Sequence, residues 1–189
     1  IDMFIDYIYL DTDERRRFAQ VSHEYLIEQV QEQELEAGTA ITNDLNFNHP
    51  VKELIWIVKP HLVEGNTGNL IGVATHEATY QLKLNGHDRF AARDFRYFTR
   101  AQVWQHHTGA GGLDASSGTV SQAGMSNDGI GVYSFALKPE EHQPSGTCNF
   151  SRIDNAQLIN TGVSHADKIF AVNYNVLRIM SGMGGLAYS

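Results

Sequence analysis

The sequence predicts an all-β domain, because short strand-like segments follow one another between turn signals along most of the chain. Its 189 residues include 17 glycines, which favours the many tight turns of such a fold. Hydrophobic residues make up 42% of the chain and charged residues 19%, the balance of a globular protein rather than of a disordered one. The length fits one domain of generous size.

Four segments have strand patterns. Met3–Leu10 is aromatic and β-branched with apolar residues on both faces, so we expect a strand buried on one side and partly covered on the other. Leu54–Val58 is continuously apolar and suits the core of a sandwich. Gly131–Leu137 alternates between large apolar residues and others. Ile169–Met180 carries apolar residues on one face and two asparagines on the other, which predicts a half-exposed strand.

The segment from Asp13 to Leu35 fits two structures. Phe18, Val21 and Tyr25 recur at helical spacing, and from Glu24 onward the alternation of a strand fits as well. Two residues precede the pattern as candidate helix caps, Asp11 and Thr12. The pattern alone leaves both alternatives open.

Two long segments are expected to be surface loops. His61–Gly72 is polar and contains glycine, and Thr108–Gly129 is glycine-rich with almost no large apolar residue. The composition of Thr108–Gly129 cannot bury a core, so we expect this segment to lie on a surface or to be mobile. Loops of this length in a compact domain usually carry function, here as display or contact surfaces.

The charge balance argues against nucleic-acid binding as the main role. The net charge is -8, from 22 acidic against 14 basic residues. Proteins that grip phosphate usually carry a basic excess. The one basic cluster, Arg15–Arg17, is flanked by acids at Asp11, Asp13 and Glu14.

Cys148 is the chain's one cysteine, which excludes an internal disulfide and fits a reducing compartment. No run approaches the roughly 18 apolar residues of a membrane span. Ile1 is not a methionine and begins inside an apolar stretch, so we expect this chain to be part of a longer one.

The candidate catalytic and metal-binding residues lack the partners that such chemistry requires. His106 and His107 are adjacent, so on a strand they would point to opposite faces and could not chelate one metal. A jelly-roll metalloenzyme of the cupin type would need His-x-His instead. Cys148 leads into a strand-like segment rather than a helix start, which predicts an inert buried thiol and not a nucleophile paired with His142. Ser145 lies in a Pro-Ser-Gly turn, not in a hydrolase elbow.

Two further clusters have structural interpretations. His87 and Asp88 follow an Asn-Gly turn and could pair for acid–base work, but a turn-stabilising contact is the commoner outcome. Glu140 and Glu141 do not form the opposed carboxylate pair of a glycosidase without partners elsewhere. We interpret them as a solvated or inter-subunit charge cluster. No enzyme signature remains, and we expect neither a catalytic site nor a cofactor.

Three long segments carry a family resemblance: IDYIYLDTDERRRFAQVSHEYLIEQVQ, FALKPEEHQPSGTCNFSRIDNAQL and YNVLRIMSGMGGLAYS. The shorter LKLNGHDRF and QHHTG lie between them in the expected order. Together the chain resembles the C-terminal half of the major capsid proteins of nucleocytoplasmic large DNA viruses, the iridovirus, phycodnavirus and mimivirus-like group. The resemblance extends over the whole chain except the variable loops.

The resemblance implies an eight-stranded antiparallel jelly-roll sandwich with short helices and long surface loops. Residues 1–189 would be the second jelly roll of a double jelly roll, with the first preceding Ile1. It also implies a short helix near Asp13–Gln20, followed by a strand from about His23 to Glu36. The expected function is that of a virion structural protein, assembled in the host cytoplasm.

The expected partners are further copies of the chain in a pseudo-hexameric homotrimer, neighbouring trimers and minor capsid proteins, with glycans compatible with the outer surface. By family analogy the two long loops would crown that surface. Contacts within the trimer are expected from Leu84–Arg100 and from the Glu140–Ser145 turn. The charged residues expected at subunit seams or as links between strands are Arg89, Arg93, Arg96, Glu140, Glu141, Arg152 and Asp154.

The segment around Pro144 has a mechanical interpretation. Pro144 fixes φ and Gly146 permits positive φ, so together they end one strand connection and begin the next. Arg152 and Asp154 would share one face of the following strand, as a buried or half-buried ion pair.

A jelly-roll carbohydrate-binding module is the alternative function, and it would need an exposed aromatic platform. The one candidate platform is Tyr97, Phe98 and Trp104.

Overall fold

The computed structural model describes residues 3–58, 78–109, 130–164 and 166–188. They form two compact units, one from Ile1–Glu28 with Asn175–Ser189 and a larger one from Gln29–Tyr174. The whole of the predicted His61–Gly72 loop lies outside the described residues, and so does the Thr108–Gly129 loop after Gly109. Among the described residues, no helix combines the length and the apolar character that crossing a bilayer requires.

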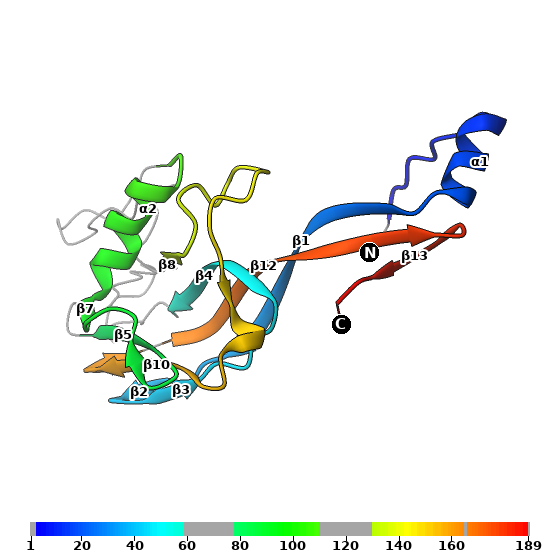
Figure 1. The fold of residues 1–189 in the computed structure, drawn as a ribbon. Helices are drawn as coiled ribbons and strands as arrows, with labels where there is room; N and C mark the ends of the chain where they lie inside the picture. Colours follow the sequence, from blue (N-terminus) through cyan, green and yellow to red (C-terminus); the bar gives the residue numbers. More distant parts are fainter. Residues whose placement is uncertain (1–2, 59–77, 110–129, 165, 189) are drawn as a thin grey trace. The chain divides into compact units, whose positions relative to one another are not determined.

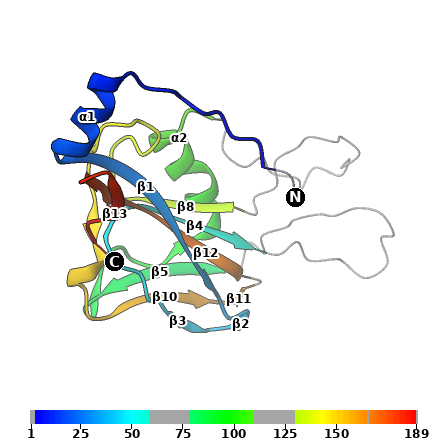
Figure 2. The same cartoon turned by 90° about the vertical axis from the view of Figure 1, so that its right-hand side faces the viewer.

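The fold is all-β, with antiparallel pairing throughout its registered strand pairs, as the sequence predicts (Figures 1 and 2). One sheet has the strand order β1-β12-β4-β8, with β9 paired to β4 and β13 paired to β12. A second sheet has the order β3-β10-β5-β6, with β7 paired to β5. Strands β2 and β11 form a short third sheet. The first sheet comprises β1 (His23–Glu34), β12 (Ala166–Met180), β4 (Pro50–Val58), β8 (Ile130–Ser134), β9 (Cys148–Asn149) and β13 (Met183–Leu186). The others comprise β3 (Thr42–Asp44), β10 (Ala156–Thr161), β5 (Thr79–Leu84), β6 (His87–Asp88), β7 (Arg93–Asp94), β2 (Gly38–Thr39) and β11 (Val163–Ser164).

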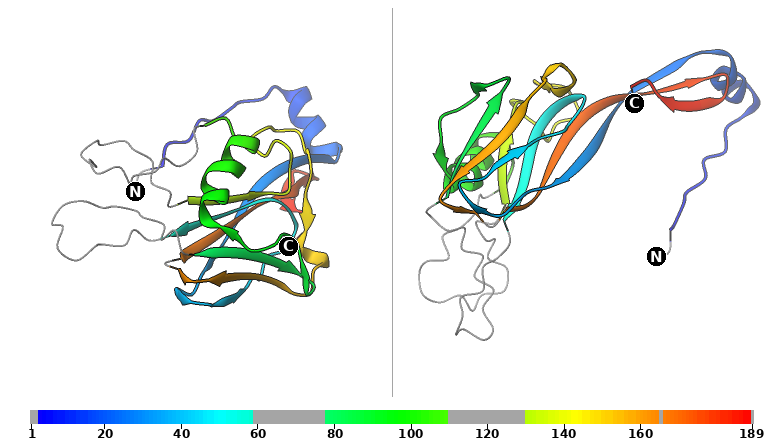
Figure 3. Two further views of the ribbon diagram at one scale, coloured as in Figure 1. Left: turned by 90° about the vertical axis from the view of Figure 1, so that its left-hand side faces the viewer. Right: turned by 90° about the horizontal axis from the view of Figure 1, so that it is seen from below.

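The described residues hold 13 strand segments, of which five (β2, β6, β7, β9 and β11) are only two residues long. The remaining eight have three residues or more. Neighbours in each sheet are mostly not consecutive in sequence, so the chain crosses between sheets repeatedly. In the larger unit the two principal sheets face each other and enclose its core (Figure 3).

The core of the larger unit is centred on Trp56 of β4, whose ring lies 5.0 Å from that of Phe98 and 5.7 Å from that of Tyr80. All three side chains are buried. The Leu54–Val58 prediction of a core strand is confirmed for one face: Leu54, Trp56 and Val58 are buried, whereas Ile55 is half-buried and Ile57 is exposed. Directly opposite Trp56 in the register is Gly131, where a Cβ atom would stand 2.7 Å from both Trp56 and Phe95.

Two glutamines on the inward-facing side of β1 substitute for a neighbouring strand. The Gln31 side chain donates to the carbonyl of Asn48 (2.7 Å) and accepts from its N–H (3.0 Å). The Gln33 side chain donates to the carbonyl of Asp44 (2.5 Å) and accepts from the N–H of Asn46 (2.9 Å). Each side-chain amide satisfies one backbone donor and one backbone acceptor. Residues 44–48 are therefore held against β1 without becoming a strand of the first sheet.

The smaller unit begins with helix α1 (Thr12–Gln20), and the strand β1 follows at His23. Asp11 is the N-cap, as proposed, and its carboxylate accepts from the N–H of Glu14 at 2.9 Å. The helix-then-strand expectation for this segment is confirmed, with both ends of the helix and the start of the strand within one residue. Within this unit β13 pairs with the end of β12.

The prediction for Met3–Leu10 is wrong. The segment is not a strand, and its large apolar side chains are exposed, among them Phe4 (96%) and Tyr9 (93%). A strand needs a neighbour to bond its backbone, and no described part of the chain pairs with this segment.

The predicted face of β12 is also wrong. Asn173 and Asn175 are buried, together with Ile169 and Ala171. On the face predicted to be buried, Phe170, Val172 and Val176 are only half-buried, and Tyr174 is the one buried residue. Hydrogen bonds explain why amides are tolerated inside. The Asn173 Oδ1 accepts from Gln31 at 3.0 Å, and the Asn175 Nδ2 donates to the carbonyl of Tyr188 at 2.8 Å.

The strand predicted over Gly131–Leu137 is shorter than expected, because β8 ends at Ser134. The N–H groups of Phe135 and Ala136 both donate to the carbonyl of Lys52, so the chain turns away from β4 there. Leu137 is consequently 72% exposed.

Sequence reasoning missed one helical segment entirely. A π-helical turn, η1 (Tyr97–Ala101), runs directly into helix α2 (Gln102–His106), and the pair packs against β8 (Figure 2). Phe98, Thr99 and Gln102 form its buried side. Phe98 and Gln102 are four positions apart, a helical spacing that could have predicted this helix from the sequence.

Candidate functional site

The predicted seam arginines lie close together in sequence but hold separate contacts. Arg96 donates through Nε and Nη2 to the two carboxylate oxygens of Asp94, at 2.9 and 3.1 Å. Arg93 lies over the ring of Tyr97, with its guanidinium 4.7 Å from the ring centre. Arg89 lies over Phe135 at 5.9 Å. All three arginines are exposed, so each has an internal partner while its outer side faces solvent.

The structure does not bring Arg152 and Asp154 together as predicted. Phe150–Arg152 forms a 3-10 turn, η2, rather than a strand, because the side chain of Asn149 accepts from the N–H of Ser151. Both charged side chains are exposed, and neither has an ion-pair partner within the described part of the chain. The backbone N–H of Asp154 donates to Asn85 instead.

Gly146 adopts φ +147, a value that favours glycine, as its place beside Pro144 predicts. A Cβ atom at Gly146 would lie 2.8 Å from the carbonyl oxygen of Phe135. Ser145 is structural rather than nucleophilic, because its hydroxyl accepts from the N–H of Lys138 and donates to its carbonyl. Cys148 is half-buried, and burial raises the pKa of its thiol, the opposite of an activated nucleophile.

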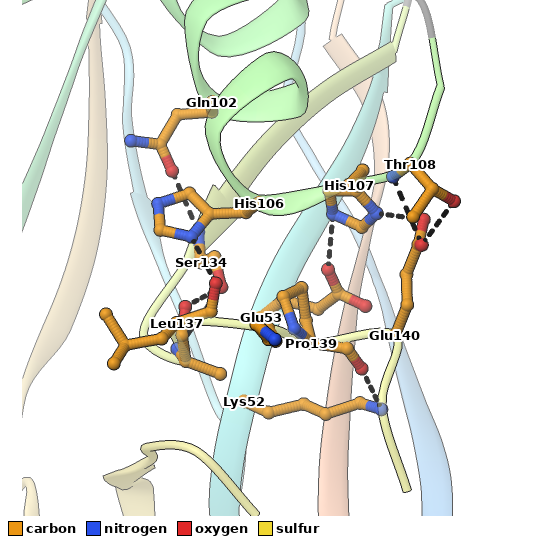
Figure 4. Close-up of polar contacts among 12 residues, drawn as sticks. Lys52, Glu53, Gln102, His106, His107, Thr108, Ser134, Leu137, Pro139 and Glu140 are labelled. Atoms are coloured by element: carbon orange, nitrogen blue, oxygen red, sulfur yellow. Dashed lines mark hydrogen bonds and ion pairs between the residues drawn. The ribbon is translucent and has the colours of Figure 1, made fainter.

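A polar cluster joins three elements of the larger unit, and we call it the His107 cluster: Glu53, His107, Thr108 and Glu140 (Figure 4). His107 caps the C-terminus of α2, Glu53 lies in β4, and Glu140 belongs to the connection from β8 to β9. The imidazole Nε2 is 3.0 Å from the Glu53 carboxylate, and Nδ1 is 3.0 Å from that of Glu140. The histidine therefore stands between two carboxylates.

Glu140 makes two further contacts in the same cluster. Its Oε2 accepts from the N–H of Thr108 at 3.1 Å and from the Thr108 hydroxyl at 2.6 Å. These two hydrogen bonds are the main reason that the pKa of Glu140 is lowered, with His107 adding to them. Glu140 is thus ionised and held in place, although its side chain is 42% exposed.

The carboxylate of Glu53 raises the pKa of His107 above its usual value, against the opposing effect of burial, and Glu140 acts in the same direction. The Nδ1 contact with Glu140 is a hydrogen bond, whereas the Nε2 contact with Glu53 has the distance of an ion pair but not the geometry of a hydrogen bond. A protonated imidazole is attracted to both carboxylates. The Glu53 side chain is only 8% exposed, so the nearby imidazolium offsets part of the cost of burying this carboxylate. The cluster is therefore an electrostatic clamp that runs from the buried Glu53 to the exposed Glu140.

Neighbouring contacts secure the same three elements (Figure 4). The buried Lys52 donates to the carbonyl of Pro139 at 2.6 Å. His106 Nδ1 lies 3.0 Å from the carbonyl of Leu137, and the Gln102 side chain accepts from the N–H of Ser134 at 3.1 Å. Together they hold the β8–β9 connection and the end of α2 against β4, which fixes the surface that Glu140 and Glu141 present.

His106 and His107 lie at a helix end and not on a strand, so the geometric premise of that prediction is wrong. They bond separate partners, and the described residues contain no group of three His, Cys, Asp or Glu side chains placed to hold a metal ion. Sequence reasoning did not pair His107 with Glu53. The available signal was Lys52-Glu53, two charged residues inside the apolar strand β4.

The aromatic residues of the alternative function do not form an exposed platform. Phe98 is fully buried and Tyr97 is half-buried beneath Arg93. Trp104 alone is exposed, at 79%. These three residues therefore do not form an exposed surface on which a sugar ring could stack.

Raising the pH is expected to weaken the His107 cluster. Because the folded-state pKa of His107 is raised, its stabilising contribution is complete below the usual His value of about 6.5 and is lost as the pH rises through the folded-state pKa. We expect the melting temperature to fall by about 2 °C or more across that alkaline window. Thermal unfolding between pH 6 and 9.5 measures it, and the variant Glu53→Gln should show a shallower decline. Equal slopes in the two proteins would contradict the assignment.

The chain matches the family model described as "Large eukaryotic DNA virus major capsid protein" over residues 14–185. It is 57% identical over 200 residues to a major capsid protein of Pyramimonas orientalis virus, covering 99% of this chain and 48% of that protein. It is 38% identical over 250 residues to a major capsid protein of Paramecium bursaria Chlorella virus 1, covering 100% of this chain and 54% of that protein.

Solved structures show the same relationship in three dimensions. A quasi-atomic model of the PBCV-1 virus capsid superimposes with a TM-score of 0.72 at 36% identity, over 97% of this chain and 55% of the other. The Faustovirus major capsid protein shares the fold alone, with a TM-score of 0.54 at 16% identity. The chain spans about half the length of the relatives that it matches.

Proposed function

Because the chain belongs to the family of large eukaryotic DNA virus major capsid proteins, we propose that it builds the outer shell of an icosahedral virion. The identity of 57% across 99% of the chain carries this conclusion. The role is structural rather than catalytic: the protein acts by specific association with further copies of itself. Its place of action is the virion, with assembly in the host cytoplasm.

The proposed architecture places residues 1–189 as the second jelly roll of a double jelly roll, with the first preceding Ile1. In support, the relatives are about twice as long as this chain. A sandwich of two packed sheets is a stiff unit that can present loops in fixed positions. The His107 cluster adds to that stiffness, because it ties a surface connection to the central strand β4.

Three copies are proposed to form a closed ring in which one face of each subunit meets a different face of the next. The exposed charges suited to those seams are Arg89, Arg93, Arg96, Glu140, Glu141, Arg152 and Asp154. Neighbouring trimers and minor capsid proteins are the further partners, and nucleic acid is not one. The net charge of -8 agrees with a shell that does not bind the genome directly.

Light scattering on the purified full-length protein tests the oligomer. A mass of three copies is expected, and a monomer at all accessible concentrations would refute the trimer.

Arg152 gives a more local test, because it is exposed and has no ion-pair partner in the described residues, so another subunit could supply one. In the full-length protein, Arg152→Ala should raise the concentration at which half of the trimer dissociates by about tenfold. The matched control is Lys168→Ala, which removes a partly exposed ion pair with Glu32 outside the segments expected at the trimer seams. Sedimentation of both variants measures the effect. Identical dissociation of Arg152→Ala and the control would remove Arg152 from the interface.

A further inference from the structure

The smaller unit, residues 1–28 with 175–189, lacks a hydrophobic core of its own. None of its described hydrophobic side chains is buried. Of the 19 large hydrophobic side chains exposed in the described part of the chain, 14 belong to this unit and 5 to the larger one. The 14 are Met3, Phe4, Ile5, Tyr7, Ile8, Tyr9, Leu10, Val21, Tyr25, Leu26, Met180, Met183, Leu186 and Tyr188. Apolar surface concentrated in this way marks an interaction surface.

The secondary structure of this unit shows what it lacks. Its sheet consists of the beginning of β1, the end of β12 and β13, and an ion pair between Arg178 and Glu24 joins the first two. Helix α1 buries no residue, and the nearest ring to Phe18 is that of His23, at 4.8 Å. A small sheet without a buried hydrophobic side chain is marginal in water, because strands are stabilised mainly by packing.

Met3–Leu10 shows the same deficit more sharply. Seven of its eight residues are large and apolar, and Asp6 is its one polar residue. Apolar residues on both faces are the pattern of a strand covered on both sides. The segment nevertheless lies exposed and outside every sheet, with Ile8 at 85%. It has the sequence of an interior strand and lacks the sheet to which such a strand would belong.

We propose that the smaller unit is the docking surface for the other half of the full-length protein, and that Met3–Leu10 adds to a sheet of that half as a strand. The proposal rests on the two-domain architecture given above. Relatives align with this chain over 99 to 100% of its length but over only 48 to 54% of theirs, so a segment of similar size remains as the occupant.

Two arguments favour this occupant over a second copy of the chain. A domain in the same polypeptide is present at millimolar effective concentration, which a separate subunit reaches only in the assembled particle. Met3–Leu10 also carries a single charge, at Asp6, and therefore offers little electrostatic selection between different partners. Main-chain pairing along an exposed sheet edge needs no such selection.

Hydrogen exchange of the full-length protein tests the proposal. The amides of residues 4–10 should exchange at least about 100-fold more slowly than in an unstructured chain, and equally slowly in dilute monomer and in trimer. Exchange at the unstructured rate would overturn the proposal. Protection that disappears on dilution would also overturn it, because it would assign the segment to a second copy.

A substitution pair gives an independent readout in the same full-length protein. Ile8→Asp places a charge in the proposed sheet and should lower the yield of soluble protein at least about fivefold, while Asp6→Asn should leave the yield unchanged. Equal yields would contradict the proposal. The capsid role is tested separately: trimers of normal mass with an unprotected Met3–Leu10 would sink this inference alone, and a protected segment without trimers would sink the proposed function alone.

Discussion

Replacing His107 with leucine is expected to destabilise the protein by about 3 kcal/mol, the loss typical when one partner of a buried ion pair is removed. Without His107, the Glu53 side chain, which is only 8% exposed, would lose the cation that lies 3.0 Å from it. Glu140 would be affected much less, because it is exposed and retains both hydrogen bonds from Thr108. Chemical denaturation of the full-length protein, followed at the transition of this domain, measures the change.

Two controls separate this electrostatic effect from loss of packing. His106→Leu removes a neighbouring histidine whose ring nitrogen contacts the carbonyl of Leu137, and a loss of about 1 kcal/mol is expected. The double variant Glu53→Leu with His107→Leu removes both charges and should recover most of the stability lost in His107→Leu. A double variant as unstable as the sum of the two single variants would contradict an ion-pair clamp.

Replacing Gly131 with valine is expected to destabilise the domain by about 3 kcal/mol or more, because overpacking a filled core forces side chains or backbone to move. A Cβ atom at Gly131 would stand 2.7 Å from the rings of Trp56 and Phe95, and both rings are buried. The matched control is Gly109→Val, since nothing lies within 4 Å of a Cβ atom at Gly109. Thermal unfolding compares the two. Equal melting temperatures would mean that the Trp56 core is looser than the structure shows.

The parts of the fold that the sequence predicted are those governed by local patterns. The apolar run of β4 and the capped helix α1 depend on residues within a few positions of one another. The buried face of β12 was predicted wrongly because Asn173 is satisfied by Gln31, which lies 142 positions away in the chain. Met3–Leu10 has a correct strand pattern but no partner in the described residues, and a pattern cannot reveal that absence.

In the candidate site, too, local features could be predicted from the sequence and long-range contacts could not. Exposure of the seam arginines follows from their charge and could be predicted, whereas the contacts of Arg93 with Tyr97 and of Arg96 with Asp94 depend on the turn that precedes η1. The clamp between Glu53 and His107 joins a strand to a helix end 54 positions later, so only the tertiary structure shows it. The two adjacent charges in β4 were its one local sign.

Electron microscopy of the purified full-length protein tests the central claim most directly. A capsid subunit of this family should appear as a three-copy particle with a hexagonal outline, or as such particles tiling a closed shell. The density of each copy should hold two β-sandwiches, one of them fitted by residues 29–174. A monodisperse monomer, or a particle whose copies do not form a three-fold ring, would contradict the account.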